Sequence, residues 1–400
     1  MKKLIKPTLL LLSMATIISC EKNEPFINAT KLEITSERNT LIVDSTTTIN
    51  PIIIPSNSTD TAIIWSTSNN AIATIDRDGN LKAISPGTVK VTATTKKGKL
   101  YAEQEIIVVR WVSRTFGNQT NMEVNAILPD AQGNLWICSN DVYKIDMAGA
   151  WQVSNQNLQP SSILQDKNGQ IWIGTQNGIQ KFDGTIWESY NSANSGLKDN
   201  SVITMVSDQN GNILASHYSR QSLLGTGVSE FDGKNWKYYS SQDGLTYDNV
   251  VSMATDKQGT KWFVTTKGIS AFDGHKWQTY NQTNVSNQLV QYAYLVAIDN
   301  QNNKWFGTNF GLLKFDGTNW TEFTNQNSGM IGGSVTSIEF DKENNLWVST
   351  GAGVAKYNGE EWTKFTRDYH PLQDVRTIKT DRSGKIYIGT GKGLLELQQD

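Results

Sequence analysis

Histidine is the side chain best suited to proton transfer near neutral pH, and this sequence contains three: His217, His275 and His370. His275 lies in an Asp-Gly-His turn, which predicts a solvated position. His217 and His370 each adjoin a tyrosine, Tyr218 and Tyr369, so these side chains could form an acid and base set. Their spacing does not demand this role, and the sequence has no nucleophile elbow, metal-spaced histidine pair or phosphate-binding glycine loop. We expect no catalytic residue, metal or cofactor, and keep a glycan-active enzyme as an alternative.

A second group of residues suits binding better than catalysis. Aromatic side chains mixed with amides and few charges are typical of sites for neutral, polyhydroxylated ligands such as glycans. The residues expected to bind a ligand are Asn200, His217, Tyr218, Arg220, Gln221, Tyr247, Asp248, Tyr292, Arg367, Tyr369 and His370. The alternative is that these are ordinary polar loops around a tolerated insertion.

A sequence repeat positions these residues from residue 110 onward. Its clearest mark is an aspartate that recurs at intervals of 36 to 48 residues, at Asp130, Asp166, Asp208, Asp256, Asp299, Asp341 and Asp381. This period is typical of a propeller blade of four short strands. In a typical unit the first strand ends at the aspartate, the second carries a tryptophan, the third runs into Phe-Asp-Gly, and the fourth carries another tryptophan. Leu214 and Tyr387 take the place of the second-strand tryptophan in the third and seventh units.

The tryptophans give the number of blades. The expected fourth strands contain seven: Trp111, Trp151, Trp187, Trp236, Trp277, Trp320 and Trp362. The last unit stops after its third strand, at residues 393–397, whereas residues 110–116 have the pattern of a fourth strand and precede the first unit. We expect residues 110–116 to complete the last blade and close a ring of seven, which removes an exposed sheet edge.

Regular features of the repeat are expected to be structural. One carboxylate per blade lacks the converging ligands of a calcium site, so we interpret the aspartates as turn caps. Tryptophans that recur once per blade are expected to pack between blades. Function is therefore sought in departures from the repeat. The second-to-third-strand connection of the third unit, residues 217–226, is longer than its counterparts. It should lie on the face of the ring that also holds the connections between blades.

Residues 30–109 form a different kind of segment. Short runs of alternating apolar and polar residues, separated by Asp-Gly and Pro-Gly, predict a small antiparallel β-sandwich. Trp65 is expected in its core. The whole chain is therefore predicted to be all-β, with an N-terminal immunoglobulin-like sandwich at 30–109 and a seven-bladed propeller at 110–400.

The N-terminal residues have the features of a targeting signal. Three lysines among the first six residues precede an apolar stretch that ends at Ile18, the pattern of an export signal. The stretch is too short to span a bilayer. Residues 17–20, Ile-Ile-Ser-Cys, resemble a bacterial lipobox. The resemblance implies that residues 1–19 are a signal peptide and that Cys20 is lipidated, with residues 20–29 as a tether.

Composition excludes other classes of partner. The 400 residues include 36 basic and 38 acidic ones, a net charge of −2, which gives no basic footprint for nucleic acid. The second cysteine, Cys138, would lack a disulfide partner if Cys20 were acylated, so we expect it to be a small buried apolar residue.

Two family resemblances accompany these predictions. The sandwich resembles a bacterial immunoglobulin-like group 2 domain, on Trp65-Ser-Thr-Ser-Asn, Ile72-Ala-Thr-Ile-Asp and a closing Val-x-Val-Thr-Ala at 89–93. The repeat, best seen at 166–175 and 341–350, resembles the two-component regulator propeller family. That resemblance implies a sensor propeller, often connected with polysaccharide use, although no kinase follows the repeats here.

Together these observations predict an exported lipoprotein, anchored through Cys20 to the bacterial outer membrane, facing either the periplasm or the cell surface. Its propeller is expected to bind a glycan or protein noncatalytically at the loop face. The alternatives are a polysaccharide lyase or hydrolase and a structural or adhesive surface protein. We expect no nucleic-acid partner, and the sequence leaves the oligomeric state open.

Overall fold

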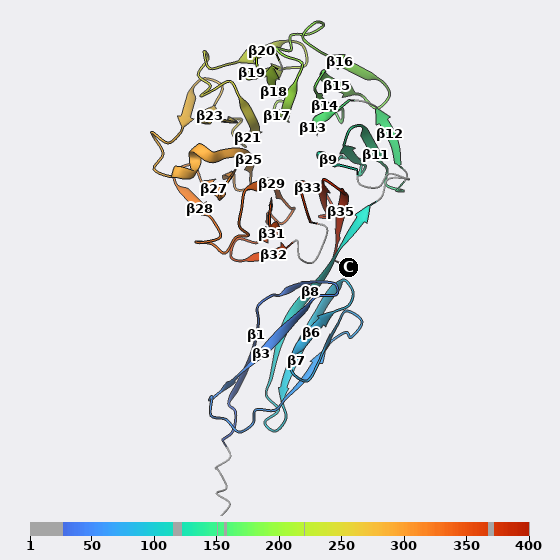
Figure 1. Cartoon of the computed structure of the whole chain (residues 1–400), viewed down its shortest axis with the longest axis vertical. Coiled ribbons are helices and arrows are strands. Elements are labelled where there is room, and N and C mark those ends of the chain that lie inside the picture. The colour runs from blue at the N-terminus through green and yellow to red at the C-terminus, as the bar shows by residue number, and fades with distance from the viewer. Residues whose placement is uncertain are drawn as a thin grey trace, which may run out of the picture.

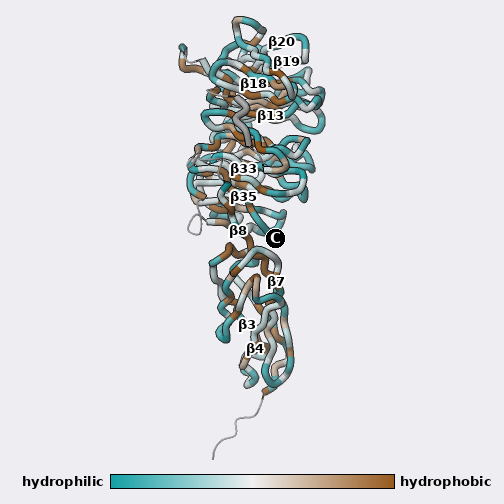
Figure 2. Tube along the Cα trace, turned by 90° about the vertical axis from the view of Figure 1, so that its right-hand side faces the viewer, coloured by the Kyte–Doolittle hydropathy of each residue, from teal (hydrophilic) through white to brown (hydrophobic). Residues whose placement is uncertain are grey.

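The protein consists of a flat ring and an elongated β-sandwich joined at the ring's edge (Figure 1). The computed structural model describes residues 27–114, 122–149, 158–219, 221–366 and 372–399, and the backbone of 151–155. Viewed from the side, the sandwich extends in the plane of the ring, so it covers neither face (Figure 2). The predicted fold class, a seven-bladed propeller after an immunoglobulin-like sandwich, is confirmed.

The sandwich packs two sheets around a small apolar core. One sheet contains, in order, β1 (Lys31–Ser36), β3 (Thr46–Ile54), β6 (Asn80–Ala83) and β5 (Ala73–Ile75). The other contains β4 (Ile63–Thr67), β7 (Gly87–Thr95) and β8 (Tyr101–Arg114), with the short β2 (Thr40–Ile42) parallel to β8. Alternation in β7 buries every second side chain, and Trp65 packs against the core as expected.

Each blade is an antiparallel sheet whose first strand lies nearest the central channel. The first three blades comprise β9 (Ala126–Pro129), β10 (Leu135–Cys138), β11 (Val142–Ile145), β12 (Trp151–Asn155); β13 (Pro160–Gln165), β14 (Ile171–Thr175), β15 (Gly178–Phe182), β16 (Trp187–Tyr190); β17 (Val202–Ser207), β18 (Ile213–Ser219), β19 (Leu224–Phe231) and β20 (Trp236–Tyr239). The next two comprise β21 (Val250–Thr255), β22 (Lys261–Thr265), β23 (Gly268–Phe272), β24 (Trp277–Tyr280); β25 (Ala293–Ile298), β26 (Lys304–Thr308), β27 (Gly311–Phe315) and β28 (Trp320–Phe323).

The last two blades comprise β29 (Val335–Phe340), β30 (Leu346–Thr350), β31 (Gly353–Tyr357), β32 (Trp362–Thr366); and β33 (Val375–Thr380), β34 (Ile386–Thr390), β35 (Gly393–Gln398) with the end of β8. The described residues include one 3-10 helix, η1 (Gln288–Tyr292), between the fourth and fifth blades. The first strands contact their neighbours all around the channel, and β9 touches both β13 and β33. The ring is therefore closed.

The recurring aspartate holds the first turn of each blade. In the fifth blade, Asp299 Oδ1 accepts the backbone N–H of Asn303 at 2.8 Å, and Oδ2 accepts the indole N–H of Trp305 at 3.0 Å. The same indole bond is present in the first, second, fourth and sixth blades. The predicted turn cap is confirmed, and it also fixes the second-strand tryptophan. Burial raises the pKa of Asp256, but hydrogen bonds from Trp262 and Lys304 outweigh this and hold the pKa below its ordinary value.

The third blade departs from this arrangement. Leu214 stands where most blades have the tryptophan, and its cross-strand partner is Glu230. In four other blades that partner is a lysine whose ammonium group lies over the tryptophan ring, as Lys181 lies 5.3 Å from the centroid of Trp172. Glu230 instead pairs with Lys261 of the fourth blade at 2.7 Å. A buried ion pair between blades thus replaces a cation–π contact within one blade.

One strand belongs to both domains. The first part of β8 pairs with β7 in the sandwich, and residues 110–114 pair antiparallel with β35, so that Trp111 faces Leu397. Residues 115 and 116 of the expected closing strand lie outside the described residues. Ile42 and Val109 of the sandwich share a buried cluster with Trp111 and Phe365 of the ring. Strand pairing and apolar packing therefore join the two domains.

Three charges, which we call the closing clasp, fasten this last blade. Arg114 of β8 donates from Nε to Glu396 Oε2 at 2.7 Å, and Lys385 lies 2.8 Å from Glu396 Oε1. The carboxylate is buried, whereas both cations are partly exposed. The clasp joins the strand from the start of the propeller to the strand from its end.

We predict that Glu396→Gln lowers the free energy of unfolding by about 2 kcal/mol, since charge-assisted hydrogen bonds to a buried carboxylate are lost. Urea denaturation measures the change. The matched control is Glu188→Gln, whose ion pair with Lys181 is 3.5 Å long and lies at the surface. The control should change the free energy by less than about 0.5 kcal/mol. Equal effects of the two substitutions would show that the clasp does not hold the ring.

Candidate functional site

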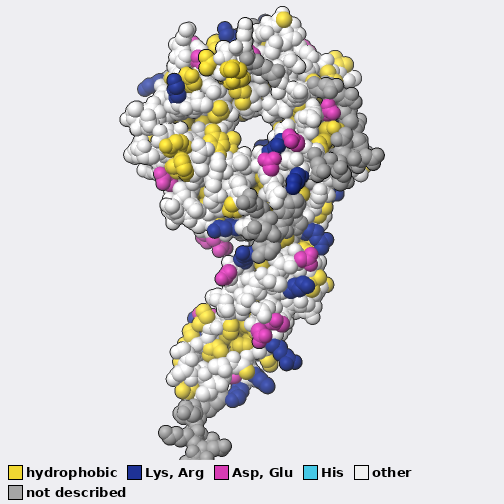
Figure 3. Space-filling view, viewed as in Figure 1, with side chains coloured by type: hydrophobic (Ala, Val, Ile, Leu, Met, Phe, Trp, Pro, Cys, Tyr) yellow, Lys and Arg dark blue, Asp and Glu magenta, His cyan; other side chains and the backbone are white. Residues whose placement is uncertain are grey.

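Two kinds of connection meet on one face of the ring, which we call the loop face. The turn between the second and third strands bonds to a connection between blades, either the one that leaves its own blade or the one that enters it. Gly178 N–H donates to Asn200 O at 2.7 Å, and Gly391 N–H donates to Asp374 O at 3.0 Å. The central channel opens on this face (Figure 3). The arrangement expected from the repeat is therefore present.

An exposed aromatic pair lies on the loop face at the fifth blade. Tyr292, at the end of η1, and Phe310, in the turn after β26, meet edge to face with ring centroids 5.0 Å apart. Their side chains are 39% and 54% exposed. The turn is rigid, because Thr308 Oγ1 accepts the Phe310 N–H at 3.1 Å and donates to Gly311 O at 2.9 Å. Both rings are therefore partly open to solvent.

Phe310 is a departure from the repeat that the sequence-based selection missed. The same turn position holds Asn177, Lys267, Ala352 and Lys392 in other blades. The turn has ordinary length, whereas the expected binding residues lie in the longer turn of the third blade and in the connections between blades. The available signal was a large apolar side chain in a turn that is otherwise polar or small.

A shallow hollow of about 500 Å³, which we call the mouth hollow, lies on the loop face over the first three blades. Its polar lining consists of uncharged side chains: Asn125, Ser139, Asn140, Gln159, Ser161, Gln176 and Ser201. Asn140, Gln159 and Gln176 have side-chain amides without hydrogen-bond partners among the described residues. These amides can donate to and accept from a ligand.

Charges at the channel mouth are paired with one another. Arg376 contacts Glu123 at 2.8 Å and Asp374 at 3.0 Å, and it donates to Asn125 at 2.7 Å. The hydrogen bond from the guanidinium to Glu123 raises the pKa of Arg376. Basic and acidic side chains are grouped beside the opening in Figure 3. Arg376 thus orients Asn125 of the hollow.

The long connection of the third blade differs from the expected loop. β18 and β19 continue pairing past an irregularity, with Tyr218 opposite Gly225 and Ser219 opposite Leu224. The insertion is therefore a projecting hairpin rather than an open loop at 217–226. Its tip exposes Gln221, Leu223 and Leu224.

His217 is a correction to the expected binding set. Its side chain is completely buried, and its Nε2 lies 2.8 Å from Ser229 Oγ. It occupies the position of the turn threonine in other blades, such as Thr175 and Thr265, and continued strand pairing covers it. Burial lowers the pKa of His217 to about 4. In this conformation it cannot touch a ligand, and it is not available as a surface acid or base.

The other expected residues divide into three groups. Asn200 and Asp248 cap loop backbones, accepting N–H groups of Ser192 and Ser241. Tyr247 lies under Lys267, whose Nζ is 4.0 Å from the ring centroid, and Tyr218 is half-buried. Arg220, Arg367, Tyr369 and His370, together with Cys20, lie outside the described residues. The described members are spread over several blades and do not converge in one cleft.

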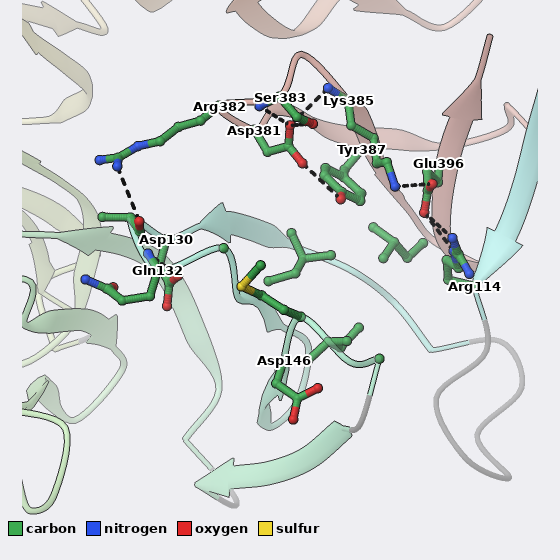
Figure 4. Close-up of a pocket in the computed structure, with 17 residues that line it drawn as sticks. Arg114, Asp130, Gln132, Asp146, Asp381, Arg382, Ser383, Lys385, Tyr387 and Glu396 are labelled. Atoms are coloured by element: carbon green, nitrogen blue, oxygen red, sulfur yellow. Dashed lines mark hydrogen bonds and ion pairs between the residues drawn. The ribbon is translucent and has the colours of Figure 1, made fainter. Parts of the chain in front are cut away.

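A larger groove of about 650 Å³ lies at the opposite face, between the seventh and first blades (Figure 4). Arg382 and Asp146 stand on different sides of it, and the closing clasp lines a third side. The carboxylates at the groove are engaged: Asp130 accepts the Trp136 indole, Asp146 accepts the Ala148 N–H at 3.0 Å, and Asp381 accepts the Tyr387 hydroxyl at 3.2 Å. Burial raises the pKa of Tyr387, which keeps the phenol neutral.

Packing explains this groove. At three other seams a second-strand tryptophan meets a third-strand phenylalanine of the next blade, with centroid distances of 5.9, 6.0 and 6.0 Å. The seam of the groove has Tyr387 and Ile145 at the corresponding positions. This smaller pair leaves space that two larger rings fill elsewhere.

Geometry and sequence pattern define a two-domain propeller protein, and family comparisons agree. Residues 28–106 match the bacterial Ig-like domain (group 2). Residues 118–141, 154–177 and 329–352 match the two component regulator propeller. The chain therefore carries a group 2 bacterial Ig-like domain followed by two component regulator propeller repeats.

Solved structures share the ring at low identity. Virginiamycin B lyase from Staphylococcus aureus is 13% identical with a TM-score of 0.58, covering 72% of this chain and 99% of the other. YCF48 from Cyanidioschyzon merolae is 15% identical with a TM-score of 0.52, covering 72% and 98%. At these identities the likeness concerns the fold.

Curated relatives match over a short stretch. Kappa-carrageenase of Pseudoalteromonas carrageenovora is 32% identical over 76 residues, 19% of each chain. The matched stretches span 8% to 19% of the lengths of the curated relatives. In the part of the chain that the structure describes, no helix is both long and apolar enough for a membrane crossing.

The burial of His217 generates a pH prediction. In the folded protein the imidazole of His217 takes up a proton only near pH 4, because its pKa is about 4. In the unfolded chain it takes up the proton near the ordinary pKa of about 6.5. Between these values the unfolded state holds more protons, so the free energy of unfolding falls as the pH is lowered, by up to about 3 kcal/mol. His217→Gln should remove this part of the pH dependence.

Urea denaturation of the wild type, His217→Gln and a control variant, measured at several pH values from 7 to 4, checks the prediction. His275→Gln is the control, because His275 is exposed in its hairpin turn. If His217→Gln keeps the full pH dependence, His217 is not the buried titrating group.

Proposed function

We propose that the propeller binds a neutral glycan noncatalytically at its loop face. The single observation that carries this proposal is the mouth hollow, whose polar lining has amides and hydroxyls but no charged side chain. A neutral sugar offers hydroxyl groups that both donate and accept, which such a lining can satisfy. A protein ligand at the same face is the closest alternative.

The aromatic pair supports the same ligand class. The exposed ring of Phe310 or Tyr292 can stack on the apolar face of a sugar, as aromatic side chains do in many polar binding sites. Hydrogen bonds fix the backbone that carries both rings before a ligand arrives, which reduces the entropy lost on binding. The two features would serve an extended ligand that crosses the loop face.

Noncatalytic binding is favoured over hydrolysis or elimination by the position of His217. The acid and base set considered from the sequence required this side chain at the channel mouth, and it is buried against Ser229. The name of the carrageenase relative keeps a glycan-active enzyme as an alternative. The exposed Leu223 and Leu224 would favour a protein-contacting or adhesive role instead.

The proposal also includes the cellular location of the protein. We infer that the protein is exported and held at the outer membrane through acyl chains on Cys20. The apolar segment and lipobox-like residues 17–20 support this, as do repeats of a class found in sensor propellers. An anchored binding protein would retain glycan fragments near the cell.

Gln176→Ala and Phe310→Ala are predicted to weaken glycan binding about tenfold each, through a lost hydrogen-bonding amide and a lost stacking surface. Residues 21–400 are screened against neutral and charged polysaccharides for binding by calorimetry and for cleavage by reducing-end release. Ile186→Ala is the control, since Ile186 is exposed in a turn on the opposite face. Cleavage by the wild type would favour the enzyme. Binding that both substitutions leave unchanged would place the ligand elsewhere.

A further inference from the structure

We propose that the end of the sandwich where the chain enters docks on an anionic lipid bilayer. The inference rests on the lipid anchor of the proposed function, and it adds a second, direct contact with the membrane. We call this region the entry end. It comprises Ile27, residues 54–64 and residues 96–101.

Hydrogen bonds gather these segments at one end of the sandwich. Thr59 N–H donates to Ile27 O at 3.0 Å, and Lys96 N–H donates to Ala62 O at 2.9 Å. Asp60 accepts the Gly98 N–H at 2.6 Å. The first described residue and the turn between β7 and β8 therefore lie together, farthest from the ring (Figure 1).

The entry end carries exposed positive charge. Lys96, Lys97 and Lys99 are all exposed in the turn between β7 and β8. The nearby carboxylate of Asp60 is 2% exposed and caps the backbone of the same turn. Figure 3 shows basic side chains gathered at the lower end of the sandwich. A surface of this sign is complementary to anionic headgroups.

Apolar side chains accompany the lysines. Tyr101 is 70% exposed and Ile64 is 55% exposed. Both are paired with Thr94 of β7, which places them in one row across the sheet. Ile54 is also exposed at this end. A combination of tyrosine, isoleucine and lysine side chains suits the boundary between the headgroups and the acyl chains of a bilayer.

The length of the preceding chain brings this surface to the membrane. Six residues lie between Cys20 and Ile27, so the two are seven Cα-to-Cα steps apart. A fully extended chain of that length reaches at most about 25 Å. If Cys20 is acylated, the entry end cannot move farther than this from the bilayer. A tether this short keeps the local lipid concentration high, so even weak contacts hold the sandwich against the surface.

Docking would also set the orientation of the ring. The sandwich extends in the plane of the ring, with the two domains joined through β8 (Figure 2). A bilayer at the entry end therefore leaves the loop face open to the side. A ligand could approach this face without passing between protein and membrane.

The test uses residues 21–400, which retain every described element and lack the acyl group. Co-sedimentation is measured with vesicles of phosphatidylcholine alone and with 30% phosphatidylglycerol, at low and high salt. We expect binding to the anionic vesicles only, weakened by salt. Replacing Lys96, Lys97 and Lys99 by Gln should weaken binding about 100-fold, at about fivefold per lysine.

The control replaces Lys82, Lys234 and Lys276 by Gln, an equal change of charge at exposed positions away from the entry end. Equal losses in the two triple variants, equal binding to both vesicle types, or no binding at low salt would overturn the proposal. Binding to a soluble anionic polysaccharide in place of the anionic vesicles would also overturn it.

Labelling of cells with a fatty-acid analogue, for wild type and Cys20→Ser, tests the anchor separately. Failure of the label with intact vesicle binding would contradict the anchor alone. Glycan binding by the lysine variant should equal that of the wild type.

Discussion

The pairing of β8 with β35 is the constraint on which this structure depends. Residues 110–114 complete a blade whose other strands come from the end of the chain. The same strand is the longest element of the sandwich sheet. The same strand pairing therefore closes the ring and fixes the position of the sandwich. Without it, β35 would have an unpaired edge, and the cluster that contains Val109, Trp111 and Phe365 would be opened to water.

Within the closed ring, stability and binding are assigned to different positions. The Asp–Trp bond repeats in five blades and is buried each time. The turns on the loop face are held by backbone and threonine hydroxyl groups, so the side chains between them can vary at little structural cost. Phe310 and the amides of the mouth hollow occupy such variable positions. The regular frame explains why an exposed phenylalanine can be carried without loss of the fold.

The sequence predicted the fold well, but it could not show which polar side chains are accessible to a ligand. The number of blades followed from Trp111 and its counterparts, because one such side chain recurs in each fourth strand, where Trp187, for example, stacks on Phe182 of its own blade. Three described members of the expected binding set are buried or cap loop backbones: Asn200, His217 and Asp248. Residue type shows what His217 can do, but its burial depends on how far β18 and β19 continue to pair. Phe310 was not predicted, because its turn has ordinary length and lies outside the connections between blades.

The most direct measurement of the central claim is hydrogen exchange in a variant with Val112→Pro and Ser113→Pro. One of two adjacent residues must direct its N–H toward β35, so the double substitution breaks the ladder. The account predicts that β35 and the neighbouring β32 lose protection, while β14, on the distant second blade, keeps its protection. Unchanged protection of β35 would contradict closure by β8.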